Sequence, residues 1–196
     1  MFVLSMPADA TLDPGALPLE RLRRLTGDEY FAMAAQGWFG DEKVELIHGL
    51  VVTMSPQNDP HATLVRRISN RITRALDERY ETSTQLPLPL ARSHVPEPDI
   101  AVIHRIDEMR HPRTALLVIE VADSSLAYDR KIKLPIYAAA EIPEYWIIDV
   151  NRAEVQVYRE PRGDLYVHAE VIGAGGRLRP AGLPTVDLSV DELFRQ

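Results

Sequence analysis

Three carboxylates stand in stretches whose other residues favour buried β-strands. Asp99, Glu120 and Glu45 are flanked by apolar side chains, in the stretches VPEPDIAVI (95–103), ALLVIEVADSS (115–125) and VELI (44–47). A buried carboxylate is unfavourable unless a hydrogen-bond network, a cation or a metal compensates its charge. Three such groups would repel one another unless a cation lies between them. Oxygen ligands suit Mg²⁺ or Mn²⁺ better than Zn²⁺, so the three acids predict a divalent metal site.

A second interpretation exists for each acid taken alone. An acid at the end of a strand often reaches solvent or pairs with an arginine. Arginines are plentiful here, because the 22 Lys and Arg residues include only three lysines, Lys43, Lys131 and Lys133. The occurrence of all three acids together with a suitably placed lysine favours the metal site over three separate surface acids.

Lys133 is that lysine. In a helix over about 130–140, Ile132 and Ile136 define the buried side, and Lys133 falls at its edge near Tyr137, while Lys131 points away. A proline fits a helix only in its first turn, so Pro135 predicts that the helix begins near Lys131 and that Lys133 lies at its start, within reach of the acids. The alternative is a solvated lysine whose stem covers apolar surface.

His61 opens a long amphipathic helix and falls on the same side as Val65 and Ile68, so it should point inward. An inward histidine is either a catalytic residue or a hydrogen-bonded member of the core, and the sequence leaves both open. On other sides of this helix, Arg66, Arg67, Arg71 and Arg74 are candidates to neutralise a nucleic-acid backbone, although they also resemble a solvated helix face.

Composition indicates one globular domain. Of 196 residues, 45% are hydrophobic and 26% charged, and we expect an irregular N-terminal arm over 1–20 followed by a folded domain over 21–196. The absence of cysteine excludes disulfides and cysteine-ligated metals. No apolar run reaches the length of a membrane span, so we expect a soluble cytoplasmic protein that binds no membrane. The net charge of −7 argues against broad adhesion to nucleic acid but permits a local basic groove.

The pattern of elements predicts an α/β fold with a mixed central sheet. Thr26 and Glu29 form a capping box for a helix that ends near Gly37, and His48-Gly49 marks a hairpin turn. The apolar runs ALLVIEVA and EYWIIDV flank a helix of crossover length, which is typical of central strands covered on both faces. The remaining elements are expected as a helix over 59–79, strands over 83–91, 98–103, 115–122, 144–150, 153–160 and 164–172, and a short C-terminal helix, SVDELF.

Taken in order, these residues resemble the PD-(D/E)XK nuclease superfamily and, more closely, its Uma-two family of restriction endonucleases. The matching stretches lie within about 26–158 and are VELIHGLVVTMSP, the histidine after it, VPEPDIAVI, LLVIEVADSS and DRKIKLPIYAAAEIPEYWIIDV. The resemblance implies a restriction-endonuclease-like mixed β-sheet flanked by helices in a single domain. It further implies a Mg²⁺-dependent endodeoxyribonuclease, in which Mn²⁺ can substitute, acting on DNA as a homodimer.

The resemblance also assigns roles. Asp99 and Glu120 would bind the metal, with Glu45 as a further direct or water-mediated ligand and Val121 offering its backbone carbonyl. Lys133 would position or activate the attacking water, and His61 matches the family's histidine at the start of the next helix. The superfamily's lysine position, two residues after the second acid, is Ala122 here, so the assignment depends on a lysine relocated to the following helix.

Two other functions remain open from the sequence. One is a catalytically inactive binding or regulatory module on a nuclease-derived fold, which the negative net charge and Ala122 favour. The other is a metal-dependent hydrolase of small phosphate compounds. A homodimer contact through the apolar stretch EVQVYRE (154–160) is a further expectation.

Overall fold

The computed structural model describes residues 21–195; the arm expected over 1–20 lies outside them. A mixed six-stranded sheet forms the centre, in the order β3-β4-β5-β6-β7-β8. Only β5 and β6 are parallel, and every other neighbouring pair is antiparallel. The mixed α/β fold predicted from the sequence is therefore confirmed. The strands are β3 (Tyr80–Ser83), β4 (Ile100–His104), β5 (Leu117–Ala122), β6 (Glu144–Asp149), β7 (Glu154–Arg162) and β8 (Leu165–Ile172).

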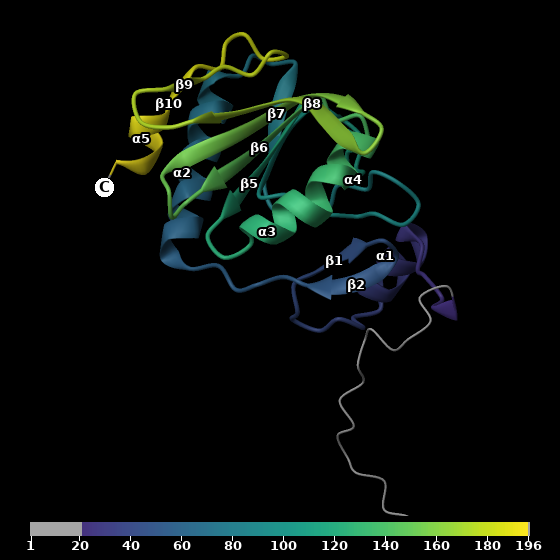
Figure 1. Cartoon of the computed structure of the whole chain (residues 1–196). Coiled ribbons are helices and arrows are strands. Elements are labelled where there is room, and N and C mark those ends of the chain that lie inside the picture. Colours follow the sequence, from purple (N-terminus) through teal and green to yellow (C-terminus); the bar gives the residue numbers. More distant parts are fainter. Residues whose placement is uncertain (1–20, 196) are drawn as a thin grey trace, which may run out of the picture.

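Helices cover both faces of this sheet (Figure 1). One face carries α2 (Asp59–Ala75) and α5 (Val190–Phe194), together with the two-stranded sheet of β9 (Arg177–Leu178) and β10 (Leu188–Ser189). The other face carries the crossover between β5 and β6, which consists of α3 (Leu126–Tyr128), the π-helical turn η3 (Asp129–Lys133) and α4 (Leu134–Ala139). The parallel β5–β6 pair requires such a crossover.

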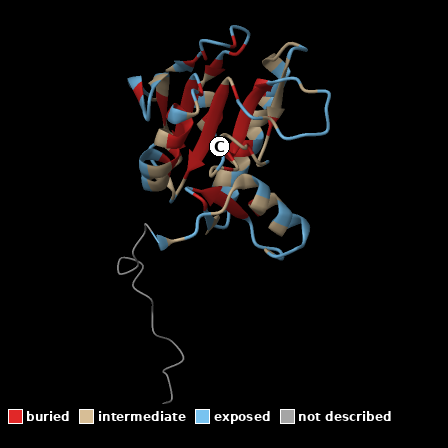
Figure 2. Cartoon of the chain, turned by 90° about the vertical axis from the view of Figure 1, so that its right-hand side faces the viewer, coloured by how far each residue is buried: buried red, intermediate tan, exposed pale blue. Residues whose placement is uncertain are grey.

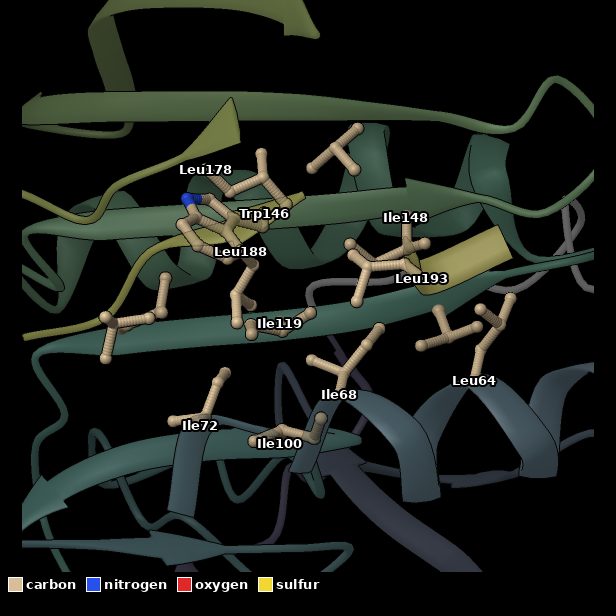
Figure 3. Packing of buried hydrophobic residues seen from close by; sticks show 14 of the residues in the cluster. Leu64, Ile68, Ile72, Ile100, Ile119, Trp146, Ile148, Leu178, Leu188 and Leu193 are labelled. Atoms are coloured by element: carbon tan, nitrogen blue, oxygen red, sulfur yellow. The ribbon is translucent and has the colours of Figure 1, made fainter. Parts of the chain in front are cut away.

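The central strands are buried because both layers pack apolar side chains against them (Figure 2). The predicted inner face of α2 is confirmed: Leu64, Val65, Ile68 and Ile72 are buried. Figure 3 shows Ile68 and Ile72 beside Ile119 of β5 and Ile100 of β4, with Trp146 of β6 in the same cluster. This packing fixes α2, and hence its first turn, against the ends of β4 and β5.

A smaller layer formed by α1 (Gly27–Ala35) and the hairpin β1 (Val44–Ile47) and β2 (Leu50–Thr53) lies beside the main sheet. The predicted Thr26–Glu29 capping box is present. His48 and Gly49 both have positive φ, as a two-residue hairpin turn requires. A Cβ at position 49 would lie 2.5 Å from the Cβ of Arg24, so glycine is needed there for space as well. The hairpin is anchored by a bridge between Leu46 and Val95.

Several predicted boundaries are wrong. The long helix ends at Ala75 and not at residue 79. The strand expected over 83–91 overlaps β3 only at Ser83, and β3 does not continue beyond it, because Pro87 and Pro89 remove N–H donors that a longer ladder needs. The crossover begins at Leu126 and not near Lys131. The π-helical turn η3 shifts the hydrogen-bond register, and this places Pro135 in the first turn of α4, where a proline is tolerated.

The stretch EVQVYRE is also not an exposed edge, since β7 pairs with β6 on one side and β8 on the other. A sheet-edge contact between two copies would have to use β3 or β8. Among residues 21–195, no helix is both long and apolar enough to cross a membrane.

Candidate active site

One cavity of about 360 Å³ brings together side chains from five separate elements. Asp99 precedes β4, Glu120 lies on β5, Glu45 on β1, His61 on α2 and Lys133 at the end of η3. All five residues singled out in the sequence line this cavity, together with Val121. The sequence spacing alone gives no such convergence; the fold creates it.

The antiparallel pairing of β4 and β5 sets Asp99 against Glu120 and Val121. Ile100 is opposite Ile119, so the residue before β4 meets the end of β5. The Val121 N–H donates to Asp99 Oδ2 at 2.9 Å, and the Asp99 N–H donates to Glu120 Oε2 at 3.3 Å. The Gln85 amide donates to Asp99 Oδ1 at 3.1 Å. The two acids are therefore held in fixed positions relative to each other.

Lys133 connects Glu120 to Glu45. Its Nζ lies 2.9 Å from Glu120 Oε1 and 3.3 Å from Glu45 Oε2. All three residues are buried, with exposed fractions of 5%, 4% and 2% for Lys133, Glu120 and Glu45. This excludes the alternative of a solvated lysine. Burial by itself would lower the pKa of Lys133, but Glu120, Glu45 and Asp129 together raise that pKa above its ordinary value, so the amine stays charged.

The position of Lys133 accounts for the missing lysine at position 122. Ala122 lies two residues after Glu120, on the same face of β5, and is completely buried beside Tyr137 and Ala138. Because residues of α4 belong to the same buried cluster, a lysine at position 122 would be buried among largely apolar side chains. The ammonium group reaches Glu120 from the crossover helix instead of from the strand.

Two tyrosines complete the network around the acids. The Tyr137 hydroxyl donates to Glu120 Oε1 at 2.7 Å, and the Tyr128 hydroxyl donates to Glu45 Oε1 at 3.0 Å. Burial, followed by the neighbouring carboxylates, raises the pKa of both phenols above its ordinary value. Both hydroxyl groups therefore remain protonated donors that orient the acids.

His61 points inward as predicted and contacts a single acid of the site. Its Nε2 lies 3.0 Å from Asp99 Oδ2, and Asn58 caps the helix by accepting from the His61 N–H at 3.1 Å. Burial would raise the pKa of Asp99, but the hydrogen bonds and charge of His61 and the bonds from Val121 and Gln85 outweigh burial and hold that pKa below its ordinary value. Asp99 is thus the acid kept ionised.

Asp129 is a member of the site that the sequence reasoning missed. It lines the cavity, is 2% exposed and accepts a hydrogen bond of 2.6 Å from the Ser125 hydroxyl. Burial raises its pKa to about 6, although Lys133 and Ser125 oppose the shift. The sequence DRKIK could have indicated Asp129, because it lies four residues before Lys133 and residues i and i+4 share a side of a helix.

The charge balance of the cavity fits a divalent cation. The cavity lining includes one lysine, Lys133, against five acids: Glu45, Asp99, Glu120, Asp123 and Asp129. Burial raises the pKa of Glu120 to about 8; Lys133 opposes this shift and Asp99 adds to it. An additional cation would offset this excess of negative charge. The carboxylates of Asp99 and Glu120 and the carbonyl of Val121 would offer an oxygen-only donor set of the kind that Mg²⁺ prefers.

This donor set differs from a cage of three carboxylates. Within 21–195, no three His, Asp or Glu side chains are arranged as ligands of one ion. Glu45 instead contacts Lys133 and Tyr128 and also accepts from the Glu97 N–H at 3.3 Å. Its geometry makes it a partner of the lysine, whereas Asp99 and Glu120 lie directly against each other.

The fold and the sequence both have recognisable relatives. A crystal structure of a putative nuclease belonging to DUF820 from Anabaena variabilis superposes with a TM-score of 0.69 at 19% sequence identity, covering 87% of this chain and 97% of that one. At this identity the match shows a shared fold. No curated protein matches the chain.

The family comparison covers most of the described structure. A family model named Uma2, described as putative restriction endonuclease, matches residues 28–191. The matched range contains the whole cavity, from Glu45 to Lys133. It also contains the hairpin, the central sheet and the crossover that position these side chains. The chain therefore belongs to the Uma2 family of putative restriction endonucleases.

Proposed function

We propose that this protein is a divalent-metal-dependent endonuclease that hydrolyses phosphodiester bonds of DNA, using Mg²⁺, with Mn²⁺ as a substitute. The observation that carries the proposal is the contact of Lys133 with Glu120 at 2.9 Å, in a cavity where Glu120 also lies against Asp99. Glu120 thus joins a lysine on one side to a second acid on the other, which is the constellation expected for metal-assisted phosphodiester hydrolysis.

Asp99, Glu120 and the Val121 carbonyl would hold the metal. When bound, the ion would supply Lewis-acid stabilisation of the phosphate and lower the pKa of a bound water. The hydrogen bonds from Gln85 and the Val121 N–H hold Asp99 in one rotamer, so the two acids are preorganised before substrate arrives.

Lys133 would orient the attacking water and stabilise the negative charge that develops on the phosphate. Its ammonium group is fixed by its contacts with Glu45 and Glu120. His61 contacts Asp99 through its Nε2, which can hold Asp99 or exchange a proton with a water.

A second candidate function is a nuclease-fold binding module without catalysis. One observation favours it: Lys133 already occupies the position between Glu45 and Glu120, which gives the acids a partner without any metal. In this case the network would only stabilise the fold.

Nicking of a supercoiled plasmid separates these candidates. The wild type should cleave in Mg²⁺ and in Mn²⁺ but not in EDTA. Asp99→Asn should lose this activity, whereas the matched control Asp107→Asn, at an exposed loop position, should retain it. The folded state of each protein is checked by circular dichroism. A folded wild type that cleaves in neither metal, or an Asp99→Asn protein of undiminished rate, would refute the nuclease proposal.

The proposal also includes a homodimer and a cytoplasmic location. A dimer would allow two cavities to act on two DNA strands. Sedimentation equilibrium of the purified chain and fractionation of the cells that produce it test these two parts separately from the chemistry.

A further inference from the structure

A second groove lies beside the catalytic cavity and has the opposite electrostatic character. Its volume is about 330 Å³, and it shares Gln57 with the catalytic cavity. Its polar lining comes from the loop before α2, one side of α2 and the segment after β3: Gln57, Arg66, Ser69, Asn70, Thr84 and Gln85. Among residues 21–195, no carboxylate lines this groove, whereas several line the catalytic cavity.

Arg66 differs from the other arginines of α2. Arg67 donates to the backbone carbonyl of Leu193 at 2.5 Å, and Arg71 donates to Glu192 at 2.6 Å, so both are engaged in docking α5. Arg66 is exposed, lines the second groove and has no side-chain hydrogen bond or ion pair within the described part of the chain. Its guanidinium group is therefore available to an anionic ligand.

Gln85 connects the groove to the proposed chemistry. Its side chain lines the groove while its amide donates to Asp99 at 3.1 Å. Along α2, His61 lines the catalytic cavity and the next residue, Ala62, lines the groove, so the two hollows lie next to each other.

We infer that this groove binds a backbone phosphate of a DNA strand whose neighbouring phosphodiester enters the catalytic cavity. Arg66 supplies the charge, and the amides and hydroxyls around it supply neutral hydrogen-bond donors, as is common for phosphate contacts that carry no base specificity. The inference rests on the proposed function for its substrate. It explains how a chain with a net charge of −7 holds a polyanion next to a group of acids.

The experiment measures DNA binding without catalysis. Fluorescence anisotropy of a fluorescein-labelled duplex oligonucleotide is recorded in EDTA over a range of salt concentrations, for the full-length wild type, Arg66→Gln and Arg74→Gln. Arg74 is a matched control, because it lies exposed on the same helix but lines a different groove with Arg67 and Arg71. Both variants remove one positive charge, so general electrostatics affects them equally.

Wild type should bind in EDTA. Arg66→Gln should weaken binding by about tenfold and reduce the slope of log affinity against log salt by about 1, whereas Arg74→Gln should stay within about twofold of wild type. Arg66→Lys should recover most of the affinity. Equal effects of Arg66→Gln and Arg74→Gln, or no binding by wild type in EDTA, would overturn the inference.

The readout separates this inference from the nuclease proposal. If the protein never cleaves DNA but Arg66→Gln lowers its DNA affinity, the phosphate-binding groove is supported and the nuclease proposal is refuted. If the protein cleaves in Mg²⁺ but Arg66→Gln binds DNA like wild type, the nuclease proposal is supported and the phosphate-binding groove is refuted.

Discussion

Replacing Lys133 by methionine should destabilise the folded protein, because Glu45 and Glu120 lose the cation between them. Methionine approximates the volume of the lysine stem but removes the charge that lies 2.9 Å from Glu120 and 3.3 Å from Glu45. Removing one partner of a buried ion pair leaves an uncompensated charge and costs about 3 to 5 kcal/mol. In a domain of this size, such a loss lowers the melting temperature by roughly 6 to 20 °C.

The loss should depend on pH. Burial raises the pKa of Glu120 to about 8 and Lys133 opposes that shift, so without Lys133 this pKa in the folded protein rises further above its value in the unfolded chain. The stability of the variant is then present at low pH and is lost as the pH rises through the folded pKa. Urea unfolding followed by circular dichroism should therefore show a larger difference from wild type near pH 8 than near pH 5.

Two further variants make this test specific. Lys131→Met removes a charge from an exposed position two residues away and should change the unfolding free energy by less than about 0.5 kcal/mol. Adding Glu45→Gln to Lys133→Met should recover part of the lost stability, because one of the orphaned charges is gone. A Lys133→Met protein within about 1 kcal/mol of wild type near pH 8 would refute the buried network on which the site is built.

Three other substitutions test single contacts. In the metal-free wild type, the raised pKa of Asp129 should make the unfolding free energy fall by on the order of 3 kcal/mol between about pH 4 and pH 6. Asp129→Asn should abolish this fall, and an unchanged pH profile of urea unfolding would contradict the prediction. Asparagine at position 85 tolerates the positive φ found there, but its shorter side chain withdraws the amide from Asp99. Gln85→Asn should therefore lower plasmid cleavage at least about tenfold with little change in melting temperature. Full activity would argue against positioning of Asp99 by Gln85. Glu144→Gln should lower the melting temperature without lowering the cleavage rate of the folded protein, because buried Glu144 binds Arg159, Trp146 and the Ala181 N–H, and none of these residues lines the candidate active-site cavity. Loss of cleavage with unchanged stability would contradict this separation.

Residue type and periodicity were sufficient for the central strands, for the long helix and for three acids of the candidate site. Asp99, Glu120 and Glu45 were recognisable because a carboxylate in an apolar strand needs an explanation. The inner face of α2 followed from its 3.6-residue period. The hairpin followed from His48-Gly49, whose conformation is set locally.

The contacts that depend on tertiary packing could not be predicted in this way. The π-helical turn η3 has no simple sequence signature, so the start of the crossover and the participation of Asp129 were missed. The pairing of Lys133 with Glu45 joins residues 88 positions apart in the chain. The separate functions of Arg66, Arg67 and Arg71 depend on where α5 docks, which is determined by long-range packing.

Binding of Mn²⁺ to the purified full-length chain tests the metal centre most directly. Isothermal titration calorimetry should detect one site in the wild type and in Asp107→Asn, and loss of this site in Asp99→Asn and in Glu120→Gln. Glu45→Gln should retain the site, because Glu45 contacts the lysine and does not complete a three-carboxylate cage. Absence of binding by wild type, or equal binding by all of these proteins, would contradict a metal held by Asp99 and Glu120.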